Sequence, residues 1–304
     1  MVPAGPTDRG RTFVCSRAMP ATADAMMTPG FAEISIEGVD ARAFLHAQLA
    51  SDLRTLAVGS WQFSCYCGVD GRVQALALLT CADEQRFSLL LPQDLADSVL
   101  ARLQRFRLRS RCALALHALA IEPWAGSGRR VHGCGMDWRI RRDETASPLS
   151  QSLWDAQLTL GIPWLLAATS ERWLPQMLTL DRLGAYSLRK GCYPGQEIVA
   201  RTHYLGRSKR RLMRLRVEAP GECPAIGVEL LDEDGSAAGN LLAIGSDGHG
   251  LAVLAERAIE GARLSCGRML MVIGSEVSGS PGDAALNEYA PGGSAHGVSD
   301  SKVV

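Results

Sequence analysis

The sequence lacks an excess of charge of either sign. Its 304 residues contain 32 lysines and arginines against 32 aspartates and glutamates, so the formal net charge at pH 7 is zero. Proteins that bind nucleic acid or a membrane surface through charge usually carry a basic excess. The sequence also has no apolar run close to the roughly 20 residues that a membrane-spanning helix needs. We therefore expect a soluble globular protein with no membrane partner, and nucleic acid is a disfavoured partner.

A secretory signal and an even number of cysteines are also lacking. Nine cysteines without such a signal predict reduced thiols and a cytoplasmic location. Cys65 and Cys67 could be read as a metal-binding pair, because residues two apart on a strand share one face. No second pair of Cys or His at ligand spacing accompanies them. We expect a structural role for this pair and no metal site.

The two ends of the chain have little that could build a core. Residues 1–27 are rich in Pro, Ala, Gly and Thr, and residues 278–304 are rich in Gly, Ser and Ala. Segments that cannot bury enough apolar surface remain disordered. We therefore predict a disordered extension, ordered structure over residues 28–277, and a disordered tail.

Hydrophobic periodicity divides the ordered part in two. The first part has strand patterns at 31–37, 61–67, 72–79, 86–91 and 112–121, and helical patterns at 41–53 and 92–106. Residues 122–150 give no clear pattern and could form a shortened second subdomain. Later come six short alternating runs, at 212–217, 227–231, 238–244, 250–254, 262–264 and 269–273. Short strands at this spacing predict a small antiparallel barrel over residues 206–277.

The most specialised stretch of the chain is Lys-Gly-Cys-Tyr-Pro-Gly-Gln-Glu at residues 190–197. Gly191 and Gly195 permit positive φ and a close approach to a ligand, and Pro194 fixes its own φ. These residues predict a rigid, sharply folded loop. A short helix is expected to begin at Gln196, with Glu197 at its positive end.

Cys192 lies in this loop, after Arg189 and Lys190 and upstream of Arg201. Neighbouring cations and a helix N-terminus both favour the thiolate over the thiol, so we predict that Cys192 is reactive. The alternative is a small buried hydrophobe in a structural turn, which is the usual role of a free cysteine.

The stretch at 190–197 resembles the K-G-C-Y-x-G-Q-E signature of the YgfZ-type folate-binding proteins, relatives of the glycine-cleavage T protein (aminomethyltransferase). The resemblance covers about residues 28–273. It implies an α+β fold, with an aminomethyltransferase-like folate-binding region of two subdomains at 28–205 and a C-terminal antiparallel β-barrel. The cofactor that it implies is tetrahydrofolate or another folate derivative.

The resemblance also assigns roles to residues. Cys192 is the catalytic candidate, and Phe31 and Trp154 align near the aromatic residues that lie against the folate. For Phe31, a core position on an edge strand is the alternative. The other candidates for the folate site lie in or near the motif. Lys190 and Arg201 would tune the thiolate, Gly191 and Gly195 would shape the loop, and Gln196 and Glu197 would order it by hydrogen bonds. Tyr193 is a further candidate for folate binding.

Three positions depart from the family pattern. True aminomethyltransferases carry an Asp on the strand that here contains Gln74 and Ala75, and glutamine cannot act as a carboxylate base. Thr159 stands near the position of an acid that pairs with the pterin, and Thr179 replaces the usual Asn of the family's P-Q-x-x-N-L box. Classical aminomethyl transfer is therefore disfavoured, and whether the chain is an enzyme stays open.

An arginine-rich segment follows the second predicted helix, with arginines at 102, 105, 107, 109 and 111. Such a run most often forms a solvated face. It could also attract the polyanionic tail of a polyglutamylated folate.

The resemblance favours a tetrahydrofolate-binding auxiliary factor for iron–sulfur cluster assembly or repair, with iron–sulfur client or assembly proteins as partners. The alternative is a folate-dependent one-carbon (aminomethyl) transferase acting on a protein-bound or RNA-bound amine, with tRNA modification as one setting. A third class, a binding module that contacts RNA through residues 201–216, is disfavoured by the neutral charge and the lack of an aromatic-interleaved RNA motif.

Overall fold

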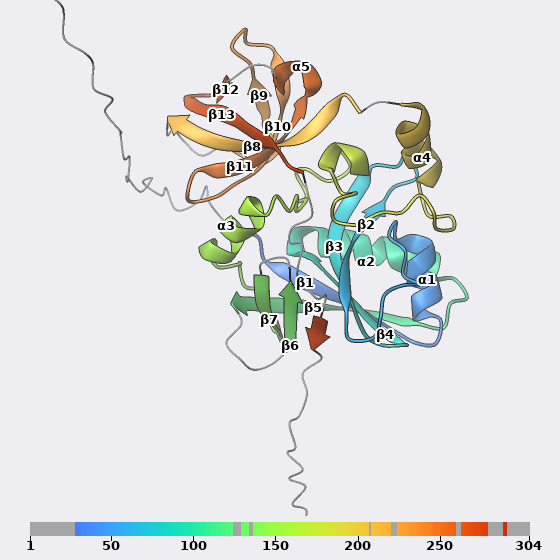
Figure 1. Ribbon diagram of the computed structural model, residues 1–304. Helices are drawn as coiled ribbons and strands as arrows, with labels where there is room; N and C mark the ends of the chain where they lie inside the picture. Colours follow the sequence, from blue (N-terminus) through green and yellow to red (C-terminus); the bar gives the residue numbers. More distant parts are fainter. Residues whose placement is uncertain are drawn as a thin grey trace, which may run out of the picture.

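The computed structural model describes residues 28–123, 129–133, 136–206, 208–219, 224–259, 263–278 and 288–290. These residues form a sheet domain and a barrel, which lies above the sheet domain in Figure 1. The predicted extension at 1–27 and most of the predicted tail lie outside the described residues. Within the tail, Glu288–Ala290 (β14) is a strand paired with Arg129–Gly133 (β6), where we expected disorder.

One eight-stranded antiparallel sheet forms the first domain, in the order β14-β6-β7-β5-β1-β4-β3-β2. Its other strands are Phe31–Glu37 (β1), Trp61–Cys67 (β2), Val73–Asp83 (β3), Arg86–Pro92 (β4), Ala113–Pro123 (β5) and Met136–Asp143 (β7). The predicted strands are all present. β6 and β7 come from the segment that the sequence pattern left unassigned, and they continue the same sheet.

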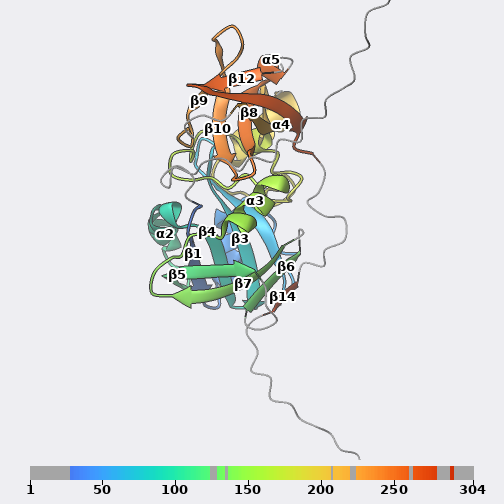
Figure 2. The same cartoon turned by 90° about the vertical axis from the view of Figure 1, so that its left-hand side faces the viewer.

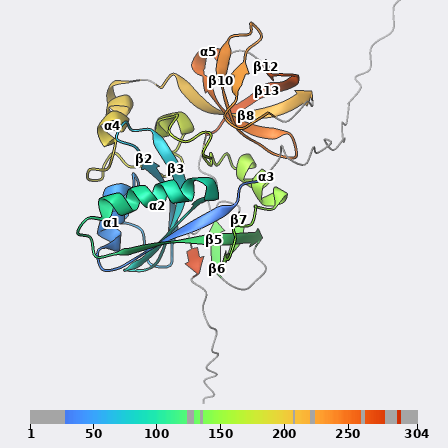
Figure 3. The same cartoon turned by 180° about the vertical axis from the view of Figure 1, so that it is seen from behind.

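Two helices, Ala41–Gln48 (α1) and Gln93–Arg107 (α2), cover one face of this sheet, as Figure 3 shows. α2 buries Leu95, Val99 and Leu103 at the spacing of one helical face. α1 is shorter than the predicted 41–53. It stops because Leu49 is extended and pairs with Tyr66 of β2, a tertiary contact that the helical pattern could not reveal.

The second domain is a closed barrel in the order β10-β11-β8-β13-β12-β9. Its strands are Arg210–Ala219 (β8), Glu229–Leu231 (β9), Ala237–Ile244 (β10), His249–Ala255 (β11), Arg263–Cys266 (β12) and Met269–Glu276 (β13), with the short helix Glu256–Ile259 (α5) after β11. The barrel has a hydrophobic core of its own. The predicted six-stranded barrel is confirmed.

Gln151–Thr159 (α3) joins the two domains and lies between them in Figure 2. The carboxylate of Asp155 accepts hydrogen bonds from the backbone N–H of Ser246 at 2.9 Å and from its hydroxyl at 2.5 Å. Ser246 lies in the turn between β10 and β11. Trp154 donates from Nε1 to the carbonyl oxygen of Ile244 at 3.3 Å. These bonds fix the barrel on the sheet domain.

Candidate functional site

The motif loop is docked on the turn between β2 and β3. Gly195 has φ 78° and forms the N-cap of Gln196–Leu205 (α4), which confirms the predicted helix start. A Cβ on Gly195 would lie 2.3 Å from the carbonyl oxygen of Gly68 and 2.5 Å from the Cα of Gly71. Side-chain atoms do not approach backbone so closely, so this contact requires glycine. Gly191 differs, because its φ lies outside the left-handed region and a Cβ there would meet no atom within 4 Å. Our steric expectation for Gly191 is therefore wrong.

Lys190 is buried beneath the loop and caps the C-terminal end of α1. Its Nζ donates to the carbonyl oxygens of His46 and Leu49, the second at 2.5 Å. The last carbonyls of a helix lack intrahelical partners and favour a cation. Nζ also lies 5.2 Å from the ring centroid of Tyr193. Burial lowers the pKa of Lys190 to about 8. We expected Lys190 to tune the thiolate of Cys192, whereas its hydrogen bonds fix the loop to α1.

Cys192 is exposed on this loop. The structure describes six cysteines, and the other five are buried or half-buried. Burial raises the pKa of the Cys65, Cys81 and Cys112 thiols, which disfavours their thiolates. The Sγ atoms of Cys65 and Cys67 lie 3.7 Å apart inside the core. The exposure of Cys192 argues against the alternative of a buried hydrophobe.

The other motif residues and Arg201 differ in their exposure to solvent. Tyr193 is buried, burial raises the pKa of its phenol, and its hydroxyl has no hydrogen-bond partner among the described residues. Gln196 donates from Nε2 to the carbonyl oxygen of Lys190 at 3.2 Å, so it orders the loop as expected. Glu197 and Arg201 are exposed on α4.

The two aromatic residues assigned to the folate are covered by the protein itself. Phe31 is fully buried on β1, a central strand and not an edge strand. Its ring makes edge-on contacts with Trp164 and Trp138, at centroid distances of 5.0 and 5.9 Å. Trp154 is 3 % exposed, and its indole N–H is used by Ile244 of the barrel. Neither ring has a free face on which a pterin could stack.

Gln74 occupies the position where the family's transferases carry Asp, and it contacts a carboxylate from elsewhere in the chain. Its Nε2 donates to Oε1 of Glu171 at 3.0 Å, and the same oxygen lies 2.7 Å from Nη2 of Arg102. Glu171 has φ 62°, a left-handed conformation that is uncommon for such a residue. No pattern in the sequence links Glu171 to Gln74, because the two residues are almost a hundred positions apart.

A cavity of about 290 Å³ lies next to α4 and to the 3-10 helix Pro175–Leu178 (η1). Its lining includes Gln176, Thr179, Asp181, Tyr186, His203 and Arg210. Side-chain oxygens of Gln176 and Thr179 are buried without a partner among the described residues. Burial raises the pKa of Tyr186, and the neighbouring Asp181 adds to this effect.

Thr179, in the lining of this cavity, has φ 50° and ψ 38°. This left-handed conformation is strained for a β-branched residue and is tolerated better by Asn, the residue that the family usually has there. The P-Q-x-x-N-L box was the sequence signal for this region. No motif in the sequence marks Asp181 or Tyr186, which also line the cavity.

The described residues contain no cluster of three or more His, Cys, Asp or Glu side chains able to hold a metal ion. Among the helices in the described ranges, none combines the length and the apolar character needed to cross a bilayer.

Two relatives at the level of sequence share the printed name tRNA-modifying protein YgfZ. The relative from Colwellia psychrerythraea is 43% identical over 97 residues, which are 31% of this chain and 30% of that protein. The relative from Edwardsiella ictaluri is 30% identical over 230 residues, covering 61% of this chain and 69% of that protein. This chain belongs to the YgfZ family.

Two further comparisons agree with membership of the YgfZ family. The model of the CAF17 C-terminal beta-barrel domain matches residues 209–278, which include all six barrel strands. Among solved structures, the aminomethyltransferase T of the glycine cleavage system from Bartonella henselae has a TM-score of 0.59 at 16% identity. This match covers 83% of this chain and 86% of that one. The predicted fold, aminomethyltransferase-like with a C-terminal barrel, is thus confirmed for this YgfZ family member.

Proposed function

We propose that this YgfZ family protein binds tetrahydrofolate and supports the assembly or repair of iron–sulfur proteins through the thiol of Cys192. One observation carries the proposal: Cys192 is exposed on a loop that is fixed at both ends. Lys190 holds one end to α1, and Gly195 holds the other against the β2–β3 turn. A thiol held in this way is presented in a defined position to a ligand or a partner protein.

The head of the folate fits the cavity beside η1 better than it fits Phe31 or Trp154. A pterin ring carries N–H and amino donors. The cavity offers the carboxylate of Asp181 and side-chain oxygens of Gln176 and Thr179 that have no hydrogen-bond partner in the described ranges. At about 290 Å³, the cavity is near the lower end of the range of about 300–1,000 Å³ for ligand pockets. It has room for the ring system, and the remainder of the folate would extend outside.

This cavity is close to the motif. His203 in its lining lies on α4, the helix that begins with Gln196 and Glu197 of the motif. Gln176 donates from Nε2 to the carbonyl oxygen of Val199 at 2.8 Å, which ties η1 to α4. When bound, tetrahydrofolate would supply a carrier of one-carbon units. The chain itself would hold the ring with Asp181 and present the thiol of Cys192.

Calorimetric titration with tetrahydrofolate tests the binding step. We expect Asp181→Asn to weaken the affinity about tenfold or more, because a hydrogen bond to a charged group contributes about 1.5–3 kcal/mol. Asp234→Asn, an exposed acid on a barrel turn, is the matched control and should bind like the unmodified protein. Equal affinity for both variants would remove this cavity from the folate site.

Complementation of cells that lack the protein tests the thiol. Cys192→Ala should reduce the activity of iron–sulfur enzymes to the level of cells without the protein, while the purified variant keeps its folded structure. Cys266→Ala, the half-buried thiol of the barrel, is the control and should complement fully. Full complementation by Cys192→Ala would reject the thiol role.

A second candidate is a one-carbon transferase acting on an RNA-bound or protein-bound amine. The contact between Gln74 and the carboxylate of Glu171 favours it, because Glu171 brings an acid to the position where Asp is missing. The relatives' name, tRNA-modifying protein, points the same way. A direct assay of methylene transfer from tetrahydrofolate separates the two candidates. Transfer that is lost in Glu171→Gln and kept in Gln74→Asp would favour the transferase, and no transfer in any form favours the auxiliary factor.

A further inference from the structure

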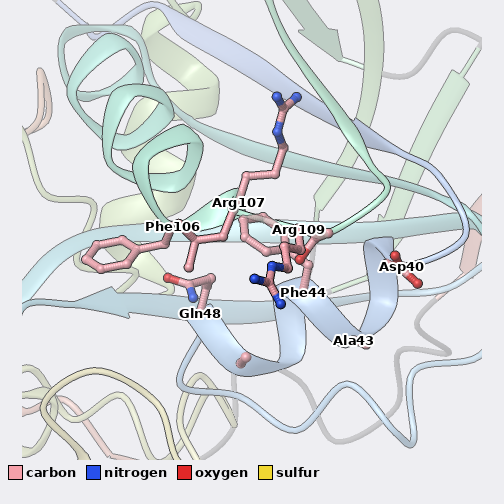
Figure 4. A pocket seen from close by; sticks show the side chains of 10 residues that line it. Asp40, Ala43, Phe44, Gln48, Phe106, Arg107 and Arg109 are labelled. Atoms are coloured by element: carbon pink, nitrogen blue, oxygen red, sulfur yellow. The ribbon is translucent and has the colours of Figure 1, made fainter.

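A groove of about 980 Å³ runs between α1 and the C-terminal end of α2. Asp40, Ala43, Phe44, Ala47 and Gln48 line it from the side of α1, and residues 106–110 line it from the side of α2. Figure 4 shows Phe106 at one end of the groove and Asp40 at the other, with the guanidinium of Arg109 beside Phe44 and Gln48. No part of the folate proposal uses this groove.

Two large apolar side chains are exposed on the α2 side. Phe106 is 46% exposed and Leu108 is 85% exposed. Leu108 has φ 41° and ψ −107°, and the backbone N–H of Ser110 donates to the carbonyl of Arg107 at 2.8 Å. This geometry is close to the first central position of a type II′ turn, at about +60° and −120°. Glycine is the favoured residue at that position, so the backbone is strained by a leucine whose side chain packs little against the fold.

Strained backbone of this kind persists where surrounding structure enforces it, and it is concentrated at sites of ligand contact and switching. The side chain of this leucine, in a position that favours glycine, packs little against the part of the chain that the structure describes. The exposed side chain is explained if it inserts into a partner.

The charges of the groove favour an acidic partner. Arg109 lines it, and no carboxylate in the described ranges of the chain forms an ion pair with its guanidinium. Arg107 also lines the groove, but its guanidinium already donates from Nη1 to the carbonyl oxygen of Cys112 at 3.3 Å. The single acid in the lining, Asp40, is already held by Arg111, whose Nε lies 3.1 Å from Oδ2. A partner with carboxylates would therefore meet positive charge that is not yet neutralised.

We infer that this groove docks a partner protein through an acidic segment that carries at least one large apolar side chain. The apolar side chain would contact Phe106 and Leu108, and a carboxylate would pair with Arg109. An entirely polar polyanion, such as a polyglutamyl tail, would leave the apolar rim uncovered.

The groove also reaches the motif. Ala47 and Gln48 lie on its α1 side. The carbonyls of the residues before and after this pair, His46 and Leu49, accept hydrogen bonds from the ammonium of Lys190. Lys190 precedes Cys192 by two residues. A segment docked along α1 would thus lie close to the loop that presents the thiol.

The test selects displayed random peptides of about a dozen residues on the full-length protein and measures their affinities by fluorescence anisotropy. We expect acidic sequences with a large apolar residue. Leu108→Gly and Arg109→Glu should each weaken their binding about tenfold or more, as truncation of a hot-spot residue does. Arg105→Glu changes an arginine of α2 outside the groove lining and should leave the affinity unchanged. Cys192→Ala should also bind normally, so the docking inference can fail or hold independently of the thiol proposal.

Leu108→Gly separates lost binding from misfolding. Relief of the strained turn should raise the urea midpoint of unfolding, while the affinity for the peptides falls. A lower midpoint would overturn the strain argument. The inference is overturned if no peptide depends on Leu108, or if the selected peptides are basic or lack an apolar residue. It is also overturned if oligouridylate RNA binds with the same dependence on Leu108 and Arg109. A dimer that Leu108→Gly dissociates would assign the groove to a second copy of the chain and likewise contradict it.

Discussion

Replacing Gly195 with alanine should detach the motif loop from the β2–β3 turn. Two costs add at this position. A non-glycine residue in the left-handed region costs about 1–2 kcal/mol, and Gly195 has φ 78°. The new Cβ would also lie 2.3 Å from the carbonyl oxygen of Gly68, so the backbone of the loop or of the turn must move. Overpacking of this kind typically costs about 1–3 kcal/mol. We expect a loss of about 2–5 kcal/mol in the free energy of unfolding.

Gly191→Ala is the matched control, four residues earlier in the same loop. Its Cβ would meet no atom within 4 Å, and its φ lies outside the left-handed region. The free energy of unfolding should stay within about 0.5 kcal/mol of the unmodified protein, as for ordinary surface substitutions. Both values come from urea unfolding, with the midpoint and the slope fitted separately. The rate at which iodoacetamide alkylates Cys192 should change in Gly195→Ala and stay the same in Gly191→Ala. Equal stability of the two variants, or a larger loss for Gly191→Ala, would refute the docking of the loop through Gly195.

The remaining predictions concern three other positions. Lys190 has a folded-state pKa of about 8 against an ordinary 10.5, so the unfolded chain binds more protons between these values and the free energy of unfolding should rise from pH 8 to pH 10.5. Lys190→Met should reduce this rise measurably, and an unchanged slope in urea unfolding would contradict the assignment. Asp155→Ala should lower the free energy of unfolding by about 2–3 kcal/mol, because the two hydrogen bonds to Ser246 are lost. It should also speed proteolysis between the domains, and an unchanged cleavage rate would show that other contacts hold the barrel in place. Thr179→Asn should stabilise the fold by about 1 kcal/mol by relieving a left-handed threonine, and a lower melting temperature would count against strain there.

The secondary structure could be read from the sequence wherever one pattern was strong. Strands β1 to β4 are buried almost throughout, and each could be read as a short run of strand-forming residues that turn residues separate from the next. The barrel strands could be read from their short runs between Gly- and Asp-rich turns. Strands β6 and β7 could not be predicted, because residues 122–150 mix arginines with apolar residues without a clear period. The end of α1 could not be predicted for another reason. Leu49 pairs with Tyr66 of β2, and this tertiary contact ends the helix although the local hydrophobic pattern continues.

For the candidate site, the backbone geometry of the motif could be predicted from the sequence. The directions in which its side chains point could not. Gly195 and the start of α4 follow from the backbone preferences of the motif. The position of Lys190 does not, because its ammonium turns toward α1, almost 150 residues earlier in the chain. Phe31 and Trp154 illustrate the same limit. Their ring type suits a pterin, but only the packed structure shows that Trp164 and the barrel already cover them.

The contact between Gln74 and Glu171 and the cavity beside η1 were missed for a related reason. Both bring together residues that are distant in sequence or lie in irregular segments. No periodicity marks a carboxylate such as that of Asp181 as part of a cavity. The P-Q-x-x-N-L box alone pointed to this region.

Time-resolved alkylation of the native protein, read by mass spectrometry with and without tetrahydrofolate, tests the central claim most directly. We predict that Cys192 is modified much faster than Cys65, Cys67, Cys81 and Cys112, and that tetrahydrofolate changes the rate at Cys192 without changing theirs. A rate at Cys192 no faster than at these buried thiols, or one that is indifferent to tetrahydrofolate, would contradict an exposed thiol that acts together with bound folate.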